Sequence, residues 1–385
     1  MRLRRVAMSR IKAFFSALLK KEGTKTVVTS LWCGLAGLIL GFLILLCINA
    51  KEAAYGMTSV LGNYLIFSDP ADRLHYFGQT LAKTAPLIAV SLSILVSYKA
   101  GLFNLGASGQ YTMAVIVISF LGVGANWPWW AVMVLAMAAG ALYSMLAGAL
   151  KAFFNVNEVI SGIMLNWIAL YFANGVLSVS PFYDSSHSEV PTLNSASNAF
   201  TPSIGLDTAF AGNPIVGLGM VLVLVVVAIV FVLFQRTTIG YELKATGLNG
   251  EAARYAGIGK IKSILIATAI SGALAGLAAS LNLQNGFSSW KLSSTPPDIG
   301  FQGISAAFLG GLHPIGVIFS SYFIVHITEG GSMITDLGFS PEVASIMTSV
   351  IIYLSGFVFF VKEIMRRNEI KGEFAKLSRE KENET

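Results

Sequence analysis

The fold of this 385-residue chain is decided by residues 299–328, which read IGFQGISAAFLGGLHPIGVIFSSYFIVHIT. The stretch is apolar, but Gly310, Gly311, His313 and Pro314 interrupt it in the middle. A helix needs about 20 apolar residues to cross the hydrocarbon layer of a bilayer, so the stretch holds either one long crossing or two short ones. The rest of the sequence decides between them.

The composition of the chain is that of a membrane protein. Hydrophobic residues make up 55% of it and charged residues only 12%, with a mean hydropathy of +0.69. An ordinary soluble domain has about twice that charged fraction. The apolar runs are continuous rather than alternating, which indicates transmembrane helices. Outside the opening stretch, crossings are predicted at residues 28–48, 81–98, 109–124, 129–151, 159–179, 214–234, 263–283 and 343–360.

Lysine and arginine collect in the cytoplasmic loops of membrane proteins, and both ends of this chain are rich in them. Eight lie in residues 1–26 and seven in residues 362–385, so both ends are predicted to be cytoplasmic. The number of crossings must then be even. That parity requires two crossings in the opening stretch, at 299–312 and 314–328, and ten in the whole chain.

The sequence therefore predicts an all-α, polytopic membrane protein of about ten transmembrane helices. A transmembrane domain, 27–361, lies between a basic cytoplasmic N-terminal segment, 1–26, and a basic cytoplasmic tail, 362–385. Residues 235–262 form the largest cytoplasmic loop and carry five basic residues, whereas the external loop, 180–213, carries none.

Two segments break the helical pattern near the middle of the membrane. The 299–312 crossing is only about 21 Å long as a helix, so the preceding Pro296, Pro297 and Asp298 must enter the membrane as non-helical backbone. Residues 99–110, KAGLFNLGASGQ, interrupt an earlier apolar region with three glycines. Paired interruptions of this kind point to a transport path and to an inverted repeat, with halves near 81–180 and 263–361. Alternatively, the glycines serve only helix packing.

Polar side chains at membrane depth are candidates for the wall of a solute path. Amides offer donors and acceptors without a charge to desolvate, which suits a neutral, hydroxyl-rich or heterocyclic solute. For each amide, a hydrogen bond between helices is the competing interpretation, and Glu158 could instead be interfacial beside Lys151. The predicted path residues are Asn104, Gln110, Asn157, Glu158, Asn166 and Gln302.

The sequence offers no catalytic site, metal site or bound cofactor. The four histidines are scattered over both sides of the membrane, and both cysteines, Cys33 and Cys47, lie in the first apolar run, where packing is the simplest role. A phosphate-binding Gly-rich loop is also missing, because Gly259 and Lys260 are followed by Ile261 rather than Ser or Thr. No ion-relay pair stands out, which argues against an autonomous secondary transporter. No nucleic-acid partner is predicted.

Three segments resemble permease subunits of ATP-binding-cassette (ABC) importers, in the group that transports branched-chain amino acids, ribose and nucleosides. They are residues 101–110 (GLFNLGASGQ), residues 157–169 (NEVISGIMLNWIA) and the inner loop with its Glu-Ala-Ala motif at 251–253. The first two are similar to nucleoside and simple-sugar permeases, although Ser108 departs from the expected motif. The coupling residues that the resemblance assigns are Gly247, Asn249, Glu251, Ala252, Ala253 and Gly257.

The resemblance implies several partners in a bacterial inner membrane. A cytoplasmic ABC ATPase would use the ATP, a second permease subunit, identical or related, would complete the path, and an external substrate-binding lipoprotein would deliver the solute. The solute implied is a nucleoside, with a ribose-like sugar as the alternative.

Overall fold

The computed structural model describes residues 22–286, 288–334 and 339–340, together with isolated positions between 343 and 367. Helices coincide with nine of the ten predicted crossings, and six of those in the described residues are long and apolar enough to span a membrane; the tenth crossing, 343–360, lies largely outside the described residues. The prediction of a polytopic all-α membrane protein is confirmed. The nine are α2 (Glu22–Ile48), α4 (Pro70–Lys99), α5 (Ala107–Ile118) continued by the π-helix η2 (Ser119–Gly124), α6 (Trp129–Phe154), α7 (Glu158–Ser178), α9 (Leu218–Arg236), α12 (Lys260–Leu283), α13 (Ile299–Leu309) and α14 (Pro314–Ser332).

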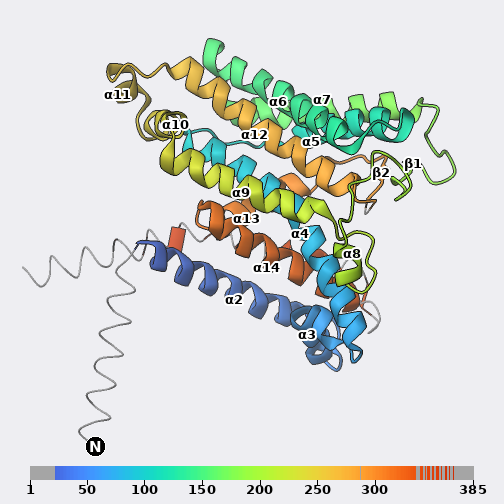
Figure 1. Ribbon diagram of the computed structural model, residues 1–385. Coiled ribbons are helices and arrows are strands. Elements are labelled where there is room, and N and C mark those ends of the chain that lie inside the picture. The colour runs from blue at the N-terminus through green and yellow to red at the C-terminus, as the bar shows by residue number, and fades with distance from the viewer. Residues whose placement is uncertain are drawn as a thin grey trace, which may run out of the picture.

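These helices run side by side between two ends of different character (Figure 1). At one end, α10 (Thr238–Leu248) and α11 (Gly250–Tyr255) project beyond the bundle, and we call this the loop end. At the other, β1 (Glu189–Val190) pairs with β2 (Trp290–Lys291), and we call this the ribbon end.

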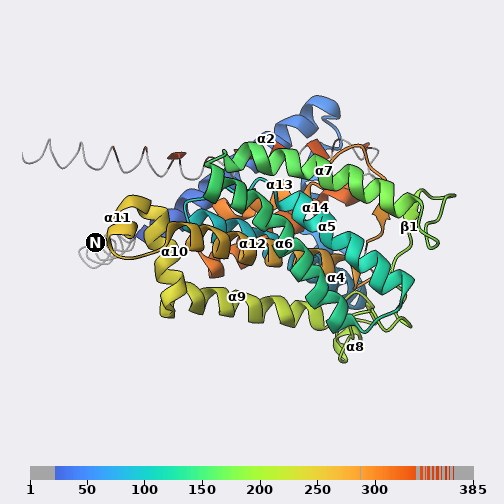
Figure 2. The same cartoon turned by 90° about the horizontal axis from the view of Figure 1, so that it is seen from above.

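Burial separates central from peripheral helices. In the most apolar part of α4, 89% of residues are buried, and 72% in α12, against 28% in α9 and 33% in α7. From above, α9 and α7 run along opposite edges of the bundle with α12 between them (Figure 2). The central helices are therefore α4 and α12, while α7 and α9 present apolar faces suited to lipid.

The two central helices come from different halves of the chain, α4 from the first and α12 from the second. α4 runs toward the loop end and α12 runs away from it. They cross where the hydroxyl oxygens of Ser93 and Ser271 lie 2.8 Å apart. α4 packs against α13 and α14 from the second half, and α12 packs against α5 and α6 from the first. This reciprocal packing is compatible with an inverted repeat of the predicted halves, which stays a prediction.

Small residues bring α6 and α12 into backbone contact. A Cβ atom added at Gly272 would lie 2.2 Å from the carbonyl oxygen of Gly140, and one at Gly276 would lie 2.4 Å from that of Ala136. Membrane helices gain their association energy from such close packing, since lipid is as apolar as the side chains. Gly140, Gly272 and Gly276 therefore serve helix packing.

Two features between the first two crossings have no counterpart in the sequence prediction. Residues 53–66 form α3 (Ala53–Gly62) and the short 3-10 helix η1 (Asn63–Ile66), and α4 begins at Pro70 rather than near residue 81. The start of α4 does carry a local signal: the Asp69 side chain accepts a hydrogen bond from the Ala71 amide, and proline occupies the first helical position.

The long loop between α7 and α9, residues 179–217, and residues 284–286 and 288–298 together cover the ribbon end. The Gln284 side chain donates to the carbonyl oxygens of Trp129 and Ala199, each at 3.0 Å, and the Gln284 carbonyl accepts from the Thr201 amide. The short helix α8 (Leu206–Ala209) lies in the same loop. These bonds tie the loop to the outer ends of α6 and α12.

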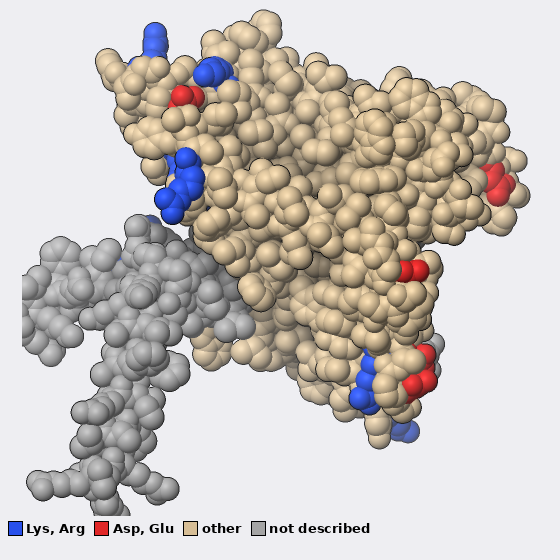
Figure 3. Space-filling view, in the orientation of Figure 1, with Lys and Arg blue, Asp and Glu red and all other residues tan. Residues whose placement is uncertain are grey.

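Charge is distributed unequally between the two ends (Figure 3). On the face shown, basic side chains stand out at the loop end, and the acidic ones gather mainly at the ribbon end beside a smaller basic group. In the turn between α13 and α14 at the loop end, burial and the nearby Lys99 charge lower the pKa of His313, so this histidine is neutral at pH 7.

We predict that Gly272→Val prevents α6 and α12 from packing, because the new side chain meets backbone atoms that cannot rotate away. Overpacking costs about 1–3 kcal/mol, and backbone contact places this case at the upper end. The measurement is the fraction of detergent-solubilised protein that elutes as a single species. Gly175→Val on α7 is the matched control, since nothing lies within 4 Å of its Cβ position; equal behaviour of the two variants would contradict the packing argument.

A second prediction concerns orientation. In a chain with Cys33 and Cys47 replaced by alanine, a cysteine at Ser195 should react with a membrane-impermeant thiol reagent in intact cells, and one at Tyr255 should not. Both positions are exposed in the isolated chain, Tyr255 by 95%, so in cells that express this chain without its ATPase, accessibility depends only on the side of the membrane. Inside-out vesicles should reverse the pattern; labelling of Tyr255→Cys in intact cells would overturn the charge-based orientation.

Candidate functional site

The chain between α4 and α5, residues 100–106, leaves the helical conformation, and we call it the broken segment. Its first backbone amides make turn bonds, such as that of Leu102 to the Ser97 carbonyl oxygen at 2.9 Å. The Asn166 side chain on α7 satisfies this backbone: its Oδ1 accepts from the Gly109 amide at 2.7 Å, and its Nδ2 donates to the Leu105 carbonyl oxygen at 2.8 Å. Asn166 is only 3% exposed. A non-helical segment at membrane depth requires such partners, because no water is there to replace them.

A cluster of amides and hydroxyls lies at the end of this segment. Asn104 and Gln110 form two hydrogen bonds with each other, at 2.9 and 3.0 Å. The Asn104 Nδ2 also donates to Ser271 Oγ at 2.8 Å and to Ser93 Oγ at 3.3 Å. Residues from α4, α5, α12 and the broken segment thus meet at one point, where the two central helices cross.

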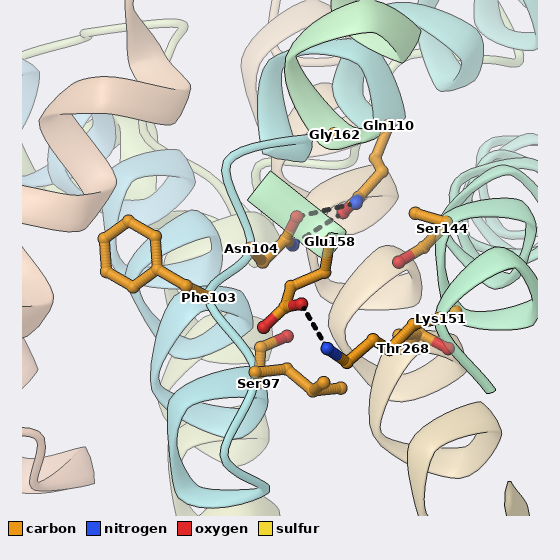
Figure 4. Close-up of a pocket in the computed structure, with 12 residues that line it drawn as sticks. Ser97, Phe103, Asn104, Gln110, Ser144, Lys151, Glu158, Gly162 and Thr268 are labelled. Carbon is orange, nitrogen blue, oxygen red and sulfur yellow. Dashed lines mark hydrogen bonds and ion pairs between the residues drawn. The ribbon is translucent and has the colours of Figure 1, made fainter. Parts of the chain in front are cut away.

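An inner recess opens beside this cluster on its loop-end side, with about 330 Å³ of empty space including the part open to solvent. Figure 4 shows Lys151 of α6 and Glu158 of α7 facing each other across it, with Nζ and Oε2 3.0 Å apart, while the Phe103 ring turns away from this ion pair. Its polar lining residues are Ser97, Asn104, Gln110, Ser144, Lys151, Glu158 and Thr268.

The structure brings together three of the six predicted path residues. Asn104, Gln110 and Glu158 line the inner recess. Asn166 lies behind the broken segment, and its side-chain amide hydrogen-bonds the backbone of Leu105 and Gly109. The other two lie elsewhere: Asn157 is the exposed N-cap of α7, accepting from the Val159 amide at 2.9 Å, and Gln302 is a partly exposed residue of α13.

Sequence reasoning did not assign four polar residues to the lining of the recess. It did place Lys151 beside Glu158, and their ion pair confirms this: Lys151 lies in the last turn of α6, seven residues before Glu158. Ser97, Ser144 and Thr268 had no such signal, since a single hydroxyl on a long apolar helix does not reveal which neighbour it faces.

The two interrupted segments meet, although almost 200 residues separate them. Ser108, in the first turn of α5, donates to the carbonyl oxygen of Pro297 at 2.8 Å, just before α13 begins. A Cβ at Gly300 would lie 2.2 Å from Ser108 Oγ. Residues 292–298 are non-helical, as predicted. Ser108, which departs from the expected motif, thus joins the two halves through its hydrogen bond to Pro297.

At the loop end, α10 and α11 form a compact two-helix projection. The Asn249 side chain accepts from the Glu251 and Ala252 amides at 3.1 and 3.0 Å and so caps α11. Ala253 is buried, and Gly257 has a φ of +82°, a value that favours glycine. Glu251 forms an exposed ion pair with Lys260 at 3.3 Å.

The backbone of the projection lies directly against the backbone around the broken segment. A Cβ at Gly247 would lie 2.3 Å from the Lys99 carbonyl oxygen and 2.7 Å from the Gly101 amide, and one at Gly101 would lie 2.9 Å from the Gly247 Cα. Gly101 has a φ of +77°. The contact therefore needs glycine on both sides, and it joins α10 to the chain that leads three residues later to Asn104.

Large apolar side chains stand out on the same projection. Leu248 is 88% and Tyr255 95% exposed, and Tyr241 is 67% exposed. Apolar side chains this exposed on a polar surface are typical of a protein contact rather than of a solvated loop.

The residues gathered in the inner recess can hydrogen-bond a polar molecule and place one ion pair beside it. Among the residues that the structure describes, no three His, Cys, Asp or Glu side chains come together as a metal site would need.

Known proteins similar to this chain are transport proteins. A nucleoside ABC transporter permease protein of Lactococcus lactis, NupB, is 29% identical over 351 residues, covering 89% of this chain and 93% of its own. A guanosine ABC transporter permease protein of Bacillus subtilis, NupP, is 28% identical, with coverages of 87% and 94%. A glucose ABC transporter permease protein of Haloferax volcanii, TsgB13, is 27% identical, with coverages of 85% and 86%.

The family model described as the branched-chain amino acid transport system / permease component matches residues 76–356. The match spans both interrupted segments, the inner recess and the α10–α11 projection. Since it covers well over half of the chain, this multi-pass membrane protein belongs to the permease-component family of branched-chain amino acid transport systems.

Proposed function

We propose that this chain is the membrane subunit of an ATP-driven importer that carries nucleosides into the cytoplasm. The observation that carries the proposal is the glycine contact between Gly247 and Gly101, because it links an exposed projection directly to the segment that lines the recess. An ATPase that binds α10 and α11 would thereby act on the recess itself.

In this mechanism, closure of the ATPase pushes α10 against residues 99–101 and shifts the broken segment. Asn104 moves with that segment, so its bonds to Ser93, Ser271 and Gln110 must rearrange. The part of the recess that is lined by Asn104 and Gln110 would then open or close. Asn166 would hold the other end of the segment fixed against α7.

Within the recess, we assign Asn104, Gln110 and Glu158 to contact with the solute. Amides match the donors and acceptors of a nucleobase edge, and a carboxylate can accept from ribose hydroxyls. Asn157 and Gln302 lie outside the recess, and their part in the path stays a prediction.

The nucleoside assignment draws support from the relatives, two of which are named for nucleosides or guanosine. A simple sugar is the second candidate, because the Haloferax relative is named for glucose. Uptake of radiolabelled guanosine and of ribose by the reconstituted complex distinguishes them: the proposal requires guanosine to be the transported solute.

The proposed partners follow from the same architecture. The loop end would face the cytoplasm and an ABC ATPase that hydrolyses ATP, and the ribbon end would face an external substrate-binding lipoprotein. A related second permease chain is supported by the relatives, because Lactococcus has both NupB and NupC and Bacillus both NupP and NupQ. The coupling roles proposed for the projection are those of Gly247, Asn249, Glu251, Ala252, Ala253 and Gly257.

The coupling contact predicts that Gly247→Ser lowers uptake by about tenfold or more, which corresponds to about 1.4 kcal/mol of lost coupling. The added Cβ would overlap the Lys99 carbonyl oxygen and push α10 off the broken segment. Gly259→Ser is the matched control, because its Cβ meets only Lys262, at 3.6 Å. The ATPase should still co-purify with Gly247→Ser; normal uptake by this variant would remove the coupling assignment.

The exposed apolar residues predict where the ATPase binds. Leu248→Asp combined with Tyr255→Asp should weaken co-purification of the ATPase by roughly 30-fold or more, as expected when anchor residues worth about 2 kcal/mol are lost. Folding should be unaffected, since both side chains are exposed. Val179→Asp, at the ribbon end and 82% exposed, makes the same chemical change away from the projection and should have no effect.

A further inference from the structure

An elbow at Thr237 joins α9 to α10 at the loop end. Thr237 ends the first helix and begins the second, and its backbone is extended there, so the chain changes direction sharply (Figure 2). One of these helices, α9, is a predicted crossing, and the other, α10, belongs to the projection that we propose as the ATPase contact. The stiffness of this elbow therefore determines whether a displacement of the projection also moves α9.

Thr237 holds both helices through one hydroxyl group. Its Oγ1 donates to the Leu233 carbonyl oxygen of α9 at 2.6 Å and accepts from the Gly240 amide of α10 at 3.1 Å. Gly240 also brings backbone against backbone, because a Cβ atom there would lie 1.9 Å from the same carbonyl oxygen. The first turn of α10 is thus in direct contact with the last turn of α9.

Lys244, in the middle of α10, adds a charged hydrogen bond to the elbow. Its Nζ donates to the Phe234 carbonyl oxygen at 2.6 Å. The last carbonyl groups of a helix have no partner within it and carry partial negative charge, so an ammonium group is a favourable partner for them. The bond is partly buried, which strengthens it relative to an exposed one.

The links between the projection and α12 are looser. Lys262 Nζ lies 3.9 Å from Glu242 Oε2, and Lys260 Nζ lies 3.3 Å from Glu251 Oε1. All four side chains are at least 31% exposed. Exposed ion pairs contribute little, because water and salt screen them. Of these connections, the elbow to α9 is therefore the more rigid one.

The α9 helix also reaches parts of the protein that the Gly247 contact does not. It packs against α4 and α14. At the ribbon end, the Leu218 amide donates to the Pro202 carbonyl oxygen of the external loop at 2.9 Å, and a Cβ at Gly217 would lie 3.0 Å from the same oxygen. With a rigid elbow, α9 is a second route from the projection into the membrane domain.

We propose that Lys244 is a positioning residue for coupling, which fixes the elbow so that α9 and α10 move as one rigid body when the ATPase closes. The proposal rests on the proposed function, since it requires an ATPase that displaces α10. Motion of the projection then enters the membrane domain by two routes, through Gly247 to the broken segment and through α9 to α4, α14 and the external loop. In this role Lys244 contacts neither solute nor nucleotide.

The test measures ATP hydrolysis and guanosine uptake together in the reconstituted complex of permease chains, ATPase and binding lipoprotein. Lys244→Met removes the ammonium group but keeps a long side chain. The ATP consumed per guanosine imported should rise about tenfold or more, as expected when a hydrogen bond to a charged group is lost. ATP hydrolysis itself and co-purification of the ATPase should not change. A misfolded chain would instead lose uptake and hydrolysis together, and that result would contradict a positioning role.

Two further variants and one control test the elbow. Thr237→Val removes the hydroxyl but keeps the shape, so it should also raise the ATP consumed per guanosine, whereas Lys244→Arg keeps a cationic donor and should leave that ratio near normal. Lys262→Met is the matched control, because its ion pair with Glu242 is long and exposed. A normal ratio in both Lys244→Met and Thr237→Val would overturn the proposal, and so would an equal rise in Lys262→Met.

Amide hydrogen exchange measures the rigidity of the elbow without any transport. In the complex with the ATPase, exchange at residues 237–241 should be about tenfold faster in Lys244→Met and unchanged in Lys262→Met, because opening of the elbow exposes the Gly240 amide. Unchanged exchange in Lys244→Met would rule out the fixing role. If the unaltered complex does not import guanosine, the proposed function fails, and the exchange measurement still decides the role of Lys244 by itself.

Discussion

The membrane interior offers the backbone no water, and the arrangement of this protein depends on how that constraint is met at residues 100–106. The segment leaves the helical hydrogen-bonding pattern at depth, where each unsatisfied amide or carbonyl would cost several kcal/mol. Asn166 donates to the Leu105 carbonyl oxygen in the segment and accepts from the Gly109 amide in the first turn of α5, and the Asn104 Oδ1 accepts from the Gly106 amide at 3.0 Å. Side-chain amides thus compensate for helical hydrogen bonds that this part of the chain lacks. The interruption in turn creates the recess.

Close packing of the central helices places this interrupted segment where it can be moved. Glycines bring α6 and α12 to backbone contact, and the crossing of α4 and α12 sets Ser93 and Ser271 beside Asn104. On the far side, Gly247 lies against the turn at Lys99 and Gly101. A displacement of the projection consequently reaches the amide cluster through a few residues of backbone, with no flexible side chain between them.

Most hydrogen-bonding groups of the inner recess are already paired with one another, so a solute that binds there would have to displace protein contacts. Ser97 is an exception, because its buried hydroxyl has no partner within the described chain.

The sequence by itself determined nine of the crossings among the described residues and the two interrupted segments, because apolar length and glycine or proline content are local properties. It missed α3, η1 and the first eleven residues of α4, which lie outside the predicted apolar runs. It also identified Asn104, Gln110 and Glu158, which line one recess, and placed Lys151 beside Glu158. Only the tertiary structure decided that Asn166 supports backbone, that Gln302 lies elsewhere, and that Gly247 meets Gly101. These facts depend on which helix faces join segments more than 50 residues apart, and a single apolar helix looks much the same from every side.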